Sequence, residues 1–277
     1  MESIIRFGIF LSVLLLMLSW EKIRPFRRFR QKKTARFLIN LGLMGLNFVV
    51  LRLLAGGGAF VAAEYSAHQN LGLFHRLDLP SGFEMALGLL ILDFAIYIQH
   101  RLLHTVPLFW RFHKVHHCDP GFDTTTAVRF HAIEILFSMY YKMVLVMVLG
   151  ASPDTVVAFE IILNACALFN HGNVRISKSR EKIIRNLLIT PDMHRIHHSA
   201  TLEETNSNYG FSVPWWDWLC NTYRKDPASG HAGMVIGIVD RNVPDRPGFL
   251  DLLVLPFASQ KDFPGQDPSI PGHERLK

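Results

Sequence analysis

The chain has 277 residues, 49% of them hydrophobic, and a formal net charge of +6. A hydrophobic fraction near one half also occurs in soluble domains, but here the apolar residues are concentrated in long blocks before residue 170. Much of the positive charge lies in residues 22–36, directly after an apolar block. This placement is typical of the cytosolic flank of a membrane span and argues against a nucleic-acid-binding protein. The three cysteines form no CxxC pair and are expected to be reduced thiols: Cys118, Cys166 and Cys220.

Several apolar blocks are long enough to cross a bilayer, which takes roughly 17–25 residues of helix. They cover residues 3–20, 37–62, 83–99, 132–150 and 153–170. The first block is followed by Glu21 and Lys22 instead of a small-residue cleavage site, so we expect a retained anchor and not a signal peptide. Between the second and third blocks, residues 63–82 are expected to form a short external segment.

The positive-inside rule places the basic run, residues 22–36, in the cytosol. The third span then leaves the membrane into the cytosol at His100. The fourth and fifth spans form a hairpin that starts near His131 and returns near His171, and the C-terminal region is cytosolic. All clustered histidines are therefore predicted to lie on one face of the membrane.

Nine of the 14 histidines fall in three compact motifs and one separate position. Residues three and four apart on a helix are neighbours, about 5–6 Å between Cβ atoms, so each motif turns its imidazoles to one side. The motifs HRLLH, HKVHH and HRIHH and the segment NHGN supply His100, His104, His113, His116, His117, His171, His194, His197 and His198. Because imidazole binds iron, zinc, copper and nickel, the clustering predicts a metal site.

The number of histidines is too large for one ion, because a structural zinc ion takes four ligands. Two ions with four or five imidazoles each account for it. The sequence lacks HExxH, in which the glutamate of a zinc protease acts as base, so a zinc-dependent intramembrane hydrolase would have no base. Neutral ligands leave a redox metal its charge and a strongly oxidising state. Chemical plausibility therefore favours two iron ions and attack on an unactivated C–H bond.

Four polar residues near these histidines are candidates for a supporting role: Asp93, Glu134, Glu160 and Asn164. Ionisable residues within a span are costly and usually face an interior site, and ligating histidines usually donate their second N–H to a carboxylate or carbonyl. These residues are therefore expected to orient ligands or line a cavity, with pairing between helices as an equal alternative for Asp93 and Glu160. His131, at the start of the fourth span, is either a tenth ligand supported by Glu134 or a helix-start residue at the lipid headgroups.

Residues 88–225 resemble the fatty acid hydroxylase/sterol desaturase superfamily of integral membrane oxidases. The resemblance is carried, in order and spacing, by LDFAIYIQHRLLH, FWRFHKVHH, RFHAIE, the His171 segment, MHRIHH and NYGFSVPWWDWLCNTYR. The last contains the family's Asn-Tyr-Gly and Trp-Asp elements at Asn208, Tyr209, Gly210, Trp216 and Asp217. The chain departs from the family pattern at Ala167, where some members have the first histidine of a paired HxxxH, and at HAIE, where HPxE is common.

The resemblance implies an all-α, multi-span membrane bundle with a cytosolic His-rich cap, in which the nine histidines hold two iron ions. It also implies O2 as co-substrate, hydroxylation or desaturation of a fatty acyl, sterol or related lipid, and electrons from a separate donor, either cytochrome b5 or ferredoxin with its reductase. We expect anchor helices in residues 1–82, the catalytic domain in 83–225 and a cytosolic tail in 226–277. A bacterial cytoplasmic membrane is favoured over the endoplasmic reticulum.

The alternative function is a non-enzymatic membrane protein that binds or transports metal. Transporters usually place their polar ligands near the middle of the membrane, whereas these histidines lie at the ends of spans and beyond. The sequence therefore favours an O2-dependent lipid hydroxylase or desaturase.

Overall fold

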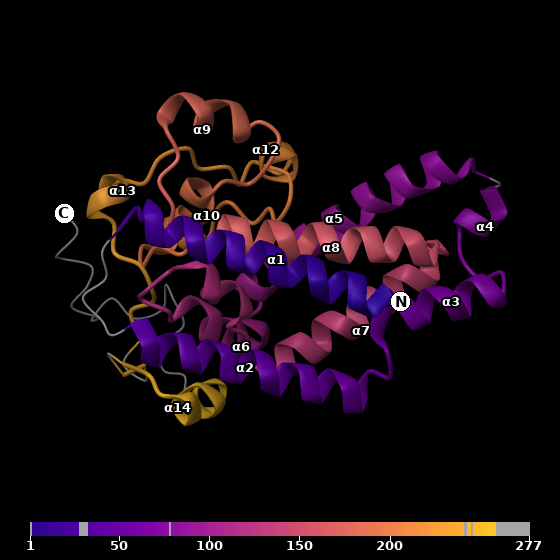
Figure 1. The fold of residues 1–277 in the computed structure, drawn as a ribbon, viewed down its shortest axis with the longest axis horizontal. Helices are drawn as coiled ribbons and strands as arrows, with labels where there is room; N and C mark the ends of the chain where they lie inside the picture. The colour runs from indigo at the N-terminus through magenta and orange to yellow at the C-terminus, as the bar shows by residue number, and fades with distance from the viewer. Residues whose placement is uncertain (1, 28–32, 78, 241–242, 245, 259–277) are drawn as a thin grey trace.

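The computed structural model describes residues 2–27, 33–77, 79–240, 243–244 and 246–258. Within these ranges the chain is helical, and β-type pairing is confined to two isolated bridges. Long helices form a stalk, and shorter helices and loops form a cap at one end of it (Figure 1). The predicted all-α, multi-span bundle is confirmed, because 5 helical segments are long and apolar enough to cross a membrane.

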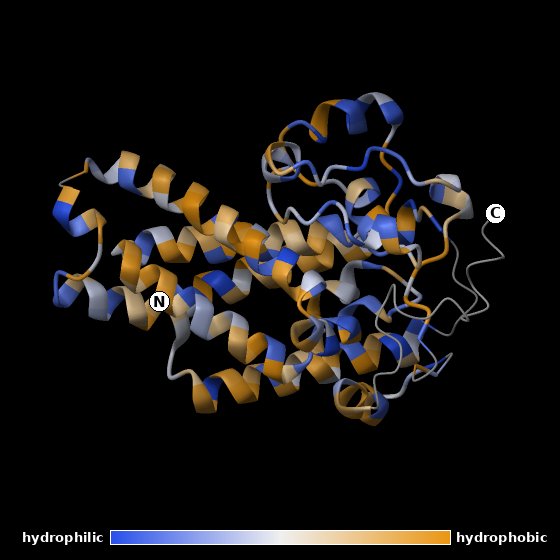
Figure 2. Ribbon diagram, turned by 180° about the vertical axis from the view of Figure 1, so that it is seen from behind, coloured by the Kyte–Doolittle hydropathy of each residue, from blue (hydrophilic) through white to orange (hydrophobic). Residues whose placement is uncertain are grey.

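Two long helices, α1 (Glu2–Ile23) and α2 (Lys33–Leu54), lie along the stalk. Many of their large apolar side chains point outward: Phe7 is 65% exposed and Phe48 is 70% exposed. Such a surface suits an environment of lipid tails, in which a helix satisfies its own backbone hydrogen bonds. Figure 2 shows the stalk as predominantly hydrophobic and the cap as more mixed. Within the basic run, residues 28–32 lie outside the described residues.

The predicted second span, residues 37–62, is interrupted near its end. α2 ends at Leu54, and α3 (Gly58–His68) begins after a turn in which Gly56 and Gly57 have φ angles of +57° and +117°. Glycine adopts such angles without a steric penalty, so this pair redirects the chain. α3 then packs against α7 and α8 within the stalk, although the sequence predicted that an external segment begins at residue 63.

The rest of the stalk consists of α4 (Phe74–Leu77), α5 (Ser81–Thr105), α7 (Ala132–Leu149) and α8 (Pro153–Asn170). α7 and α8 form the predicted hairpin. Gly150 ends α7 in the left-handed region, with φ of +69°, and the Ser152 side chain caps α8 by accepting an N–H bond from Thr155. The bundle is filled by a buried apolar cluster that includes Ala63, Leu92, Val146 and Phe159.

The cap is built from short helices joined by loops. These are α6 (Pro107–His117), η1 (Thr124–Val128), α9 (Lys178–Ile184), α10 (Pro191–His197), α11 (Leu202–Thr205), α12 (Trp215–Leu219), α13 (Gly230–Gly233), α14 (Phe249–Val254) and η2 (Leu255–Phe257). The predicted tail is described up to residue 258, where α14 packs on α2 and η2 packs on α6. Residues 259–277 lie outside the described part of the chain.

A buried polar network fixes the cap to α2. Arg36 forms ion pairs with Asp119 and Asp123, both in the loop after α6. The side chain of Asn40 accepts a hydrogen bond from Arg129 at 3.0 Å. Burial alone would raise the pKa of Asp119, but Arg36 and Arg129 lower it to about 2. The carboxylate is therefore charged at neutral pH and joins the first turn of α2 to the cap.

Candidate metal centre

Helices α5 and α6 carry more than half of the candidate ligands. The last turns of α5 reach the cap and place His100 and His104 on one face, one turn apart. The last turns of α6 carry His113, His116 and His117, and Pro107 occupies the first turn of this helix, where a missing N–H costs no hydrogen bond. All five imidazoles are buried, with exposures of 4% or less.

The remaining candidate ligands come from α8 and α10. His171 directly follows the last residue of α8 as its C-cap, so the membrane hairpin places this ring at the cap. α10 is capped by Thr190, whose hydroxyl accepts the N–H bond of Met193 at 3.3 Å. The short helix turns the HRIHH motif inward, and each of its histidines is 0% exposed: His194, His197 and His198.

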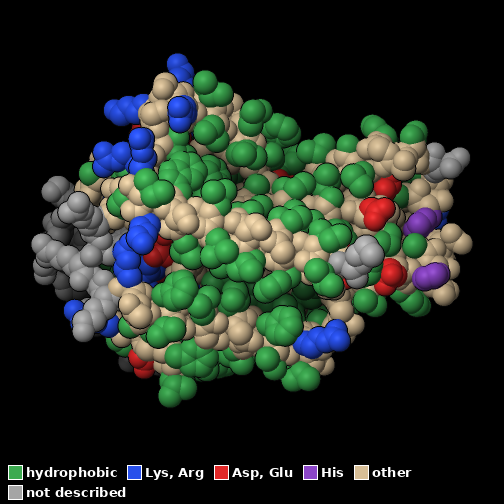
Figure 3. All heavy atoms as spheres, viewed as in Figure 1, with side chains coloured by type: hydrophobic (Ala, Val, Ile, Leu, Met, Phe, Trp, Pro, Cys, Tyr) green, Lys and Arg blue, Asp and Glu red, His purple; other side chains and the backbone are tan. Residues whose placement is uncertain are grey.

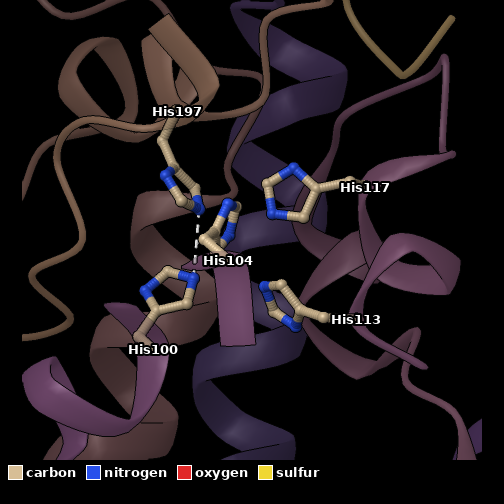
Figure 4. Close-up of side chains that lie close together, drawn as sticks. All are labelled: His100, His104, His113, His117 and His197. Carbon is tan, nitrogen blue, oxygen red and sulfur yellow. Dashed lines mark hydrogen bonds between the residues drawn. The ribbon is translucent and has the colours of Figure 1, made fainter. Parts of the chain in front are cut away.

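The structure gathers the nine histidines into two groups. The five-histidine group contains His100, His104, His113, His117 and His197 (Figure 4). The four-histidine group contains His116, His171, His194 and His198. Within each group, the nitrogen atoms that the side chains offer lie within 4.8 Å of one another. The groups adjoin, since the rings of His117 and His198 stack with centroids 4.3 Å apart.

The separations between nitrogen atoms fit metal coordination. Nε2 of His197 lies 3.0 Å from Nε2 of His100, as the dashed line in Figure 4 marks. In the other group, Nε2 of His171 lies 3.0 Å from that of His194 and 3.1 Å from that of His116. Two nitrogens bound at about 2.1 Å to one ion, at a right angle, are about 3.0 Å apart. Adjacent ligands of a single ion would show this spacing.

Several ring nitrogens in the centre have no hydrogen-bond partner. These atoms are both nitrogens of His104, His117 and His198, Nε2 of His113 and Nδ1 of His194. Buried polar atoms are nearly always satisfied, so this concentration of unpartnered imidazole nitrogens requires an explanation. Metal ions would explain these unpartnered nitrogens, because they would bind the lone pairs that no protein donor reaches.

Hydrogen bonds to Nδ1 decide which nitrogen five of the rings present. Four rings donate from Nδ1 to backbone oxygens: His100 to Tyr209 at 2.7 Å, His116 to Arg129 at 3.3 Å, His171 to Ala167 at 2.7 Å and His197 to Ser207 at 2.8 Å. The fifth, His113, donates to the Glu134 carboxylate at 2.7 Å. A ligating histidine held through one nitrogen has its tautomer and ring orientation fixed. In each of these rings Nε2 is therefore the atom that faces the centre.

Burial favours the neutral form of six imidazoles of the cap. It is the largest cause that lowers the pKa of His171 to about 4 and that of His197 to about 3. Burial and neighbouring imidazoles also hold four further histidines well below their usual pKa: His116, His117, His194 and His198. Metal ligation requires the neutral ring, so the site is ready to bind metal at pH 7.

The two candidate residues of the RFHAIE segment, His131 and Glu134, lie in different surroundings. Glu134 orients a member of the five-histidine group, His113. His131 belongs to neither group. It begins α7, where Nδ1 accepts the N–H bond of Ile133 at 3.2 Å, and its Nε2 lies 3.3 Å from the backbone oxygen of Leu253. The structure therefore places His131 at a helix start, which was the second of the two interpretations from the sequence.

Glu160 and Asn164 lie in α8 among polar partners other than the histidines. Glu160 pairs with Lys142 of α7 at 2.8 Å and with Arg6 of α1. Asn164 donates to the backbone oxygen of Glu160 at 2.7 Å. These contacts join three stalk helices, so Glu160 corresponds to the interpretation of pairing between helices.

The loop that carries Tyr209 and the helix α12 that carries Asp217 form a wall of the centre, a role that sequence reasoning did not assign. The backbone oxygen of Tyr209 accepts from His100, and Asp217 accepts the backbone N–H bonds of Tyr209 and the next residue, each at 2.8 Å. Trp216 of α12 donates its Nε1–H to Asp93 of α5 at 2.7 Å, so Asp93 anchors this wall to the stalk. The sequence signal for this contact was the spacing of the NYG and WD elements. Asp217 lies eight and seven residues after the two backbone N–H groups that it binds.

Comparisons with known proteins agree with this site. Residues 85–222 match the fatty acid hydroxylase family. The chain is 28% identical over 275 residues to ornithine lipid hydroxylase of Rhizobium tropici, across 94% of this chain and 78% of that protein. It is 29% identical over 223 residues to alkylglycerol monooxygenase of Xenopus tropicalis, across 76% of this chain and 44% of that protein. It is 27% identical over 139 residues to human cholesterol 25-hydroxylase, across 49% of each. No solved structure matches significantly.

The matched segment contains every candidate ligand, from His100 to His198. The chain spans less than half of the length of the alkylglycerol monooxygenase and of the cholesterol hydroxylase. All three relatives are hydroxylases or monooxygenases by name, which supports an enzyme over a protein that only binds or transports metal. The histidine motifs, the helical membrane bundle and the matched segment agree, and the chain therefore belongs to the fatty acid hydroxylase family of membrane lipid oxidoreductases.

Proposed function

We propose that the chain is an O2-dependent lipid hydroxylase whose nine histidines hold two iron ions. The observation that carries the proposal is the division of buried imidazoles into adjacent groups of five and four, at the end of a membrane bundle. A zinc ion takes four ligands and an octahedral metal takes six, so nine rings are too many for one ion, whereas two ions use every ring. The position beside membrane helices places a lipid chain within reach.

When bound, two iron ions supply the redox chemistry that reduces O2 and inserts an oxygen atom into a C–H bond. The chain's own residues would hold the ions and keep water away from them. Glu134 and the backbone oxygens fix the rings so that Nε2 faces inward. Aromatic side chains exclude water from the rings: Phe130 stacks on His116 at a centroid distance of 4.3 Å, and Phe211 lies 5.1 Å from His100.

We propose a polar membrane lipid as the substrate and hydroxylation, in preference to desaturation, as the reaction. Support comes from the relatives, which are named for hydroxylation of an ornithine lipid, monooxygenation of an alkylglycerol and hydroxylation of cholesterol. The electrons come from a separate donor, cytochrome b5 or ferredoxin with its reductase. The sequence has neither the CxxCH motif of attached haem nor the GxGxxG fingerprint of a dinucleotide site.

We propose that the cap faces the cytosol of a bacterial cytoplasmic membrane. α1 runs toward the cap and α2 runs away from it, so the end of α1 and the start of α2 lie at the cap end (Figure 1). Lys22 and Arg24 are exposed there. Positive residues beside short membrane spans remain on the cytosolic side.

The test combines metal analysis with an oxygen-tracing assay on protein reconstituted in lipid nanodiscs. With a membrane lipid extract, a reducing system and ¹⁸O2, we expect two iron ions per chain and a lipid product that carries one ¹⁸O atom. Chelation should abolish the product, and iron should restore it. Fewer than two metal ions per chain, together with activity that survives chelation, would contradict the proposal.

A further inference from the structure

The cap carries an exposed apolar surface at one side, formed by α9, the turn after it, and α12. Its large side chains are strongly exposed: Leu219 at 73%, Ile183 at 67% and Leu187 at 60%. Trp215 and Trp218 are 40% and 42% exposed beside them. Trp215 donates its Nε1–H to the backbone oxygen of Asn186 at 3.1 Å, which joins α12 to the turn after α9. We call this surface the α9–α12 face.

The α9–α12 face lies at the depth of a membrane span. Trp216 of α12 bonds to Asp93 at 2.7 Å and contacts the ring of Phe94, with centroids 4.8 Å apart. Both partners belong to α5, one of the membrane spans. Asp93 precedes His100 by seven residues, and at 1.5 Å per residue it lies about 10 Å closer to the far end of the stalk than the metal ligand. α12 is therefore beside the lipid-facing stalk and not on top of the cap.

The part of the cap that carries the α9–α12 face, here the α9–α12 lobe, has basic side chains on one side (Figure 3). Lys178, Arg180 and Lys182 of α9 are exposed. Figure 3 shows basic side chains on the outer side of the lobe and hydrophobic side chains on the side toward the stalk, continuous with the apolar surface of the stalk. Tryptophan at the headgroup level and lysine or arginine directed toward water are typical of a segment that lies in a membrane interface.

We propose that the α9–α12 face is embedded in the interfacial layer of the phospholipid leaflet on the cap side. The bilayer is the occupant favoured by the bond between α12 and a membrane span and by the continuity of the apolar surface. Soluble proteins rarely expose an uninterrupted apolar patch of this kind. A lipid substrate would meet the enzyme at this face, beside the wall of the metal centre that Trp216 anchors. The proposal concerns membrane contact and holds independently of the reaction catalysed.

The test measures depth with environment-sensitive labels in nanodiscs. Leu187→Cys and Leu219→Cys are labelled in a C166S/C220S background, because the remaining Cys118 is buried. The matched control is Ala232→Cys on α13, which is exposed and lies at the end of the cap away from the stalk (Figure 1). Iron content is measured for every variant, so that misfolding is detected separately.

We expect lipids with a nitroxide near the headgroup to quench the labels at 187 and 219 at least about two-fold more than the label at 232, with the reverse order for aqueous iodide. Equal access of iodide to all three labels would overturn the proposal. Protection of 187 and 219 from both quenchers would also overturn it and point to a protein partner or a second copy. A phospholipid with a diazirine in its acyl chain should crosslink the unmodified chain at 183–188 and 215–219, and absence of these adducts contradicts the proposal.

Discussion

At the residue scale, the centre depends on which nitrogen each histidine presents. The sequence predicted eight of the nine rings from their spacing, because three- and four-residue intervals are visible along one helix; His171 stands apart in the sequence. It predicted less about the acceptors. Three of the backbone oxygens that fix Nδ1, those of Ala167, Ser207 and Tyr209, lack any signature in their side chains. Position 167 illustrates this, since its alanine contributes through its backbone oxygen and not through its side chain.

His197→Ala removes one ligand from the five-histidine group. We expect iron to fall below two ions per chain and lipid hydroxylation to drop by about 100-fold or more, a loss at least as large as that from a supporting residue. The measurement is metal analysis with product formation in nanodiscs. His68→Ala, at the exposed end of α3, is the control and should leave both values unchanged. Full turnover in His197→Ala would remove this residue from the ligand set.

Glu134→Gln keeps an oxygen that can accept from His113 but loses the negative charge. Because a carboxylate raises the basicity of the ring that it holds, we expect the affinity for metal to fall by about 10-fold. Competition with a graded series of chelators measures this. Glu64→Gln, at an exposed position of α3, provides the matched control. If both variants retain metal equally, Glu134 does not support the centre.

The low pKa values of the cap histidines predict how the metal-free chain responds to pH. The folded protein has a pKa of about 4 at His171 and about 3 at His197, whereas an unfolded histidine titrates near 6.5. The unfolded chain therefore binds more protons as the pH falls below about 6.5, so the folded state loses stability on acidification. Thermal unfolding of the metal-free protein should shift to lower temperature between pH 7 and pH 5. A midpoint that does not change over this range would contradict the lowered pKa values.

At the element scale, the stalk helices could be predicted from hydropathy and helix-ending residues, but their polar partners could not. Glu160 was visible as a costly residue within a span. Its partner Arg6 lies 154 residues away in another helix, and no local pattern connects them. The break between α2 and α3, in contrast, has a cause that is local in the sequence, the glycine pair at 56 and 57. It was missed because apolar residues continue on both sides of the pair.

Asp119→Ala tests the network that fixes α2 to the cap. Arg36 would retain Asp123 but lose one buried carboxylate, and removal of one partner from a buried ion pair costs about 3 kcal/mol or more. Denaturant unfolding in detergent micelles should show a loss of about this size. Asp226→Ala, at an exposed site, should change stability by less than about 0.5 kcal/mol. Equal stability of the two variants would mean that the network does not hold the cap.

At the scale of the whole molecule, the sequence predicted that the clustered histidines share one face, and the structure places them in a single cap. This succeeded because hydropathy locates the spans well enough to set their order across the bilayer, although it missed the end of α2 at Leu54. The compact path of the cap loops could not be predicted, since it depends on contacts between residues far apart in sequence, such as Trp216 and Asp93, which are separated by 123 residues.

The two ends of the molecule should lie on opposite sides of the membrane. A cysteine at position 232, on the cap, is expected to react with a membrane-impermeant thiol reagent in inverted vesicles, and one at position 68, at the other end of the stalk, in spheroplasts. The proposed cytosolic orientation requires this order of labelling. The reverse order would place the metal centre outside the cytosol.

The composition of the two histidine groups has a consequence for the lifetime of the protein. The first group joins α5, α6 and α10, and the second joins α6, α10 and the residues that directly follow α8 and α10. His100 and His197, neighbours in one group, are 97 residues apart in the chain. Bound ions would therefore act as cross-links that close long loops between stalk and cap, and binding energy becomes folding energy. In a cell short of iron, the membrane helices would still insert, but the cap would be held less firmly and be more open to proteolysis. Iron supply would then set the amount of enzyme as well as its activity.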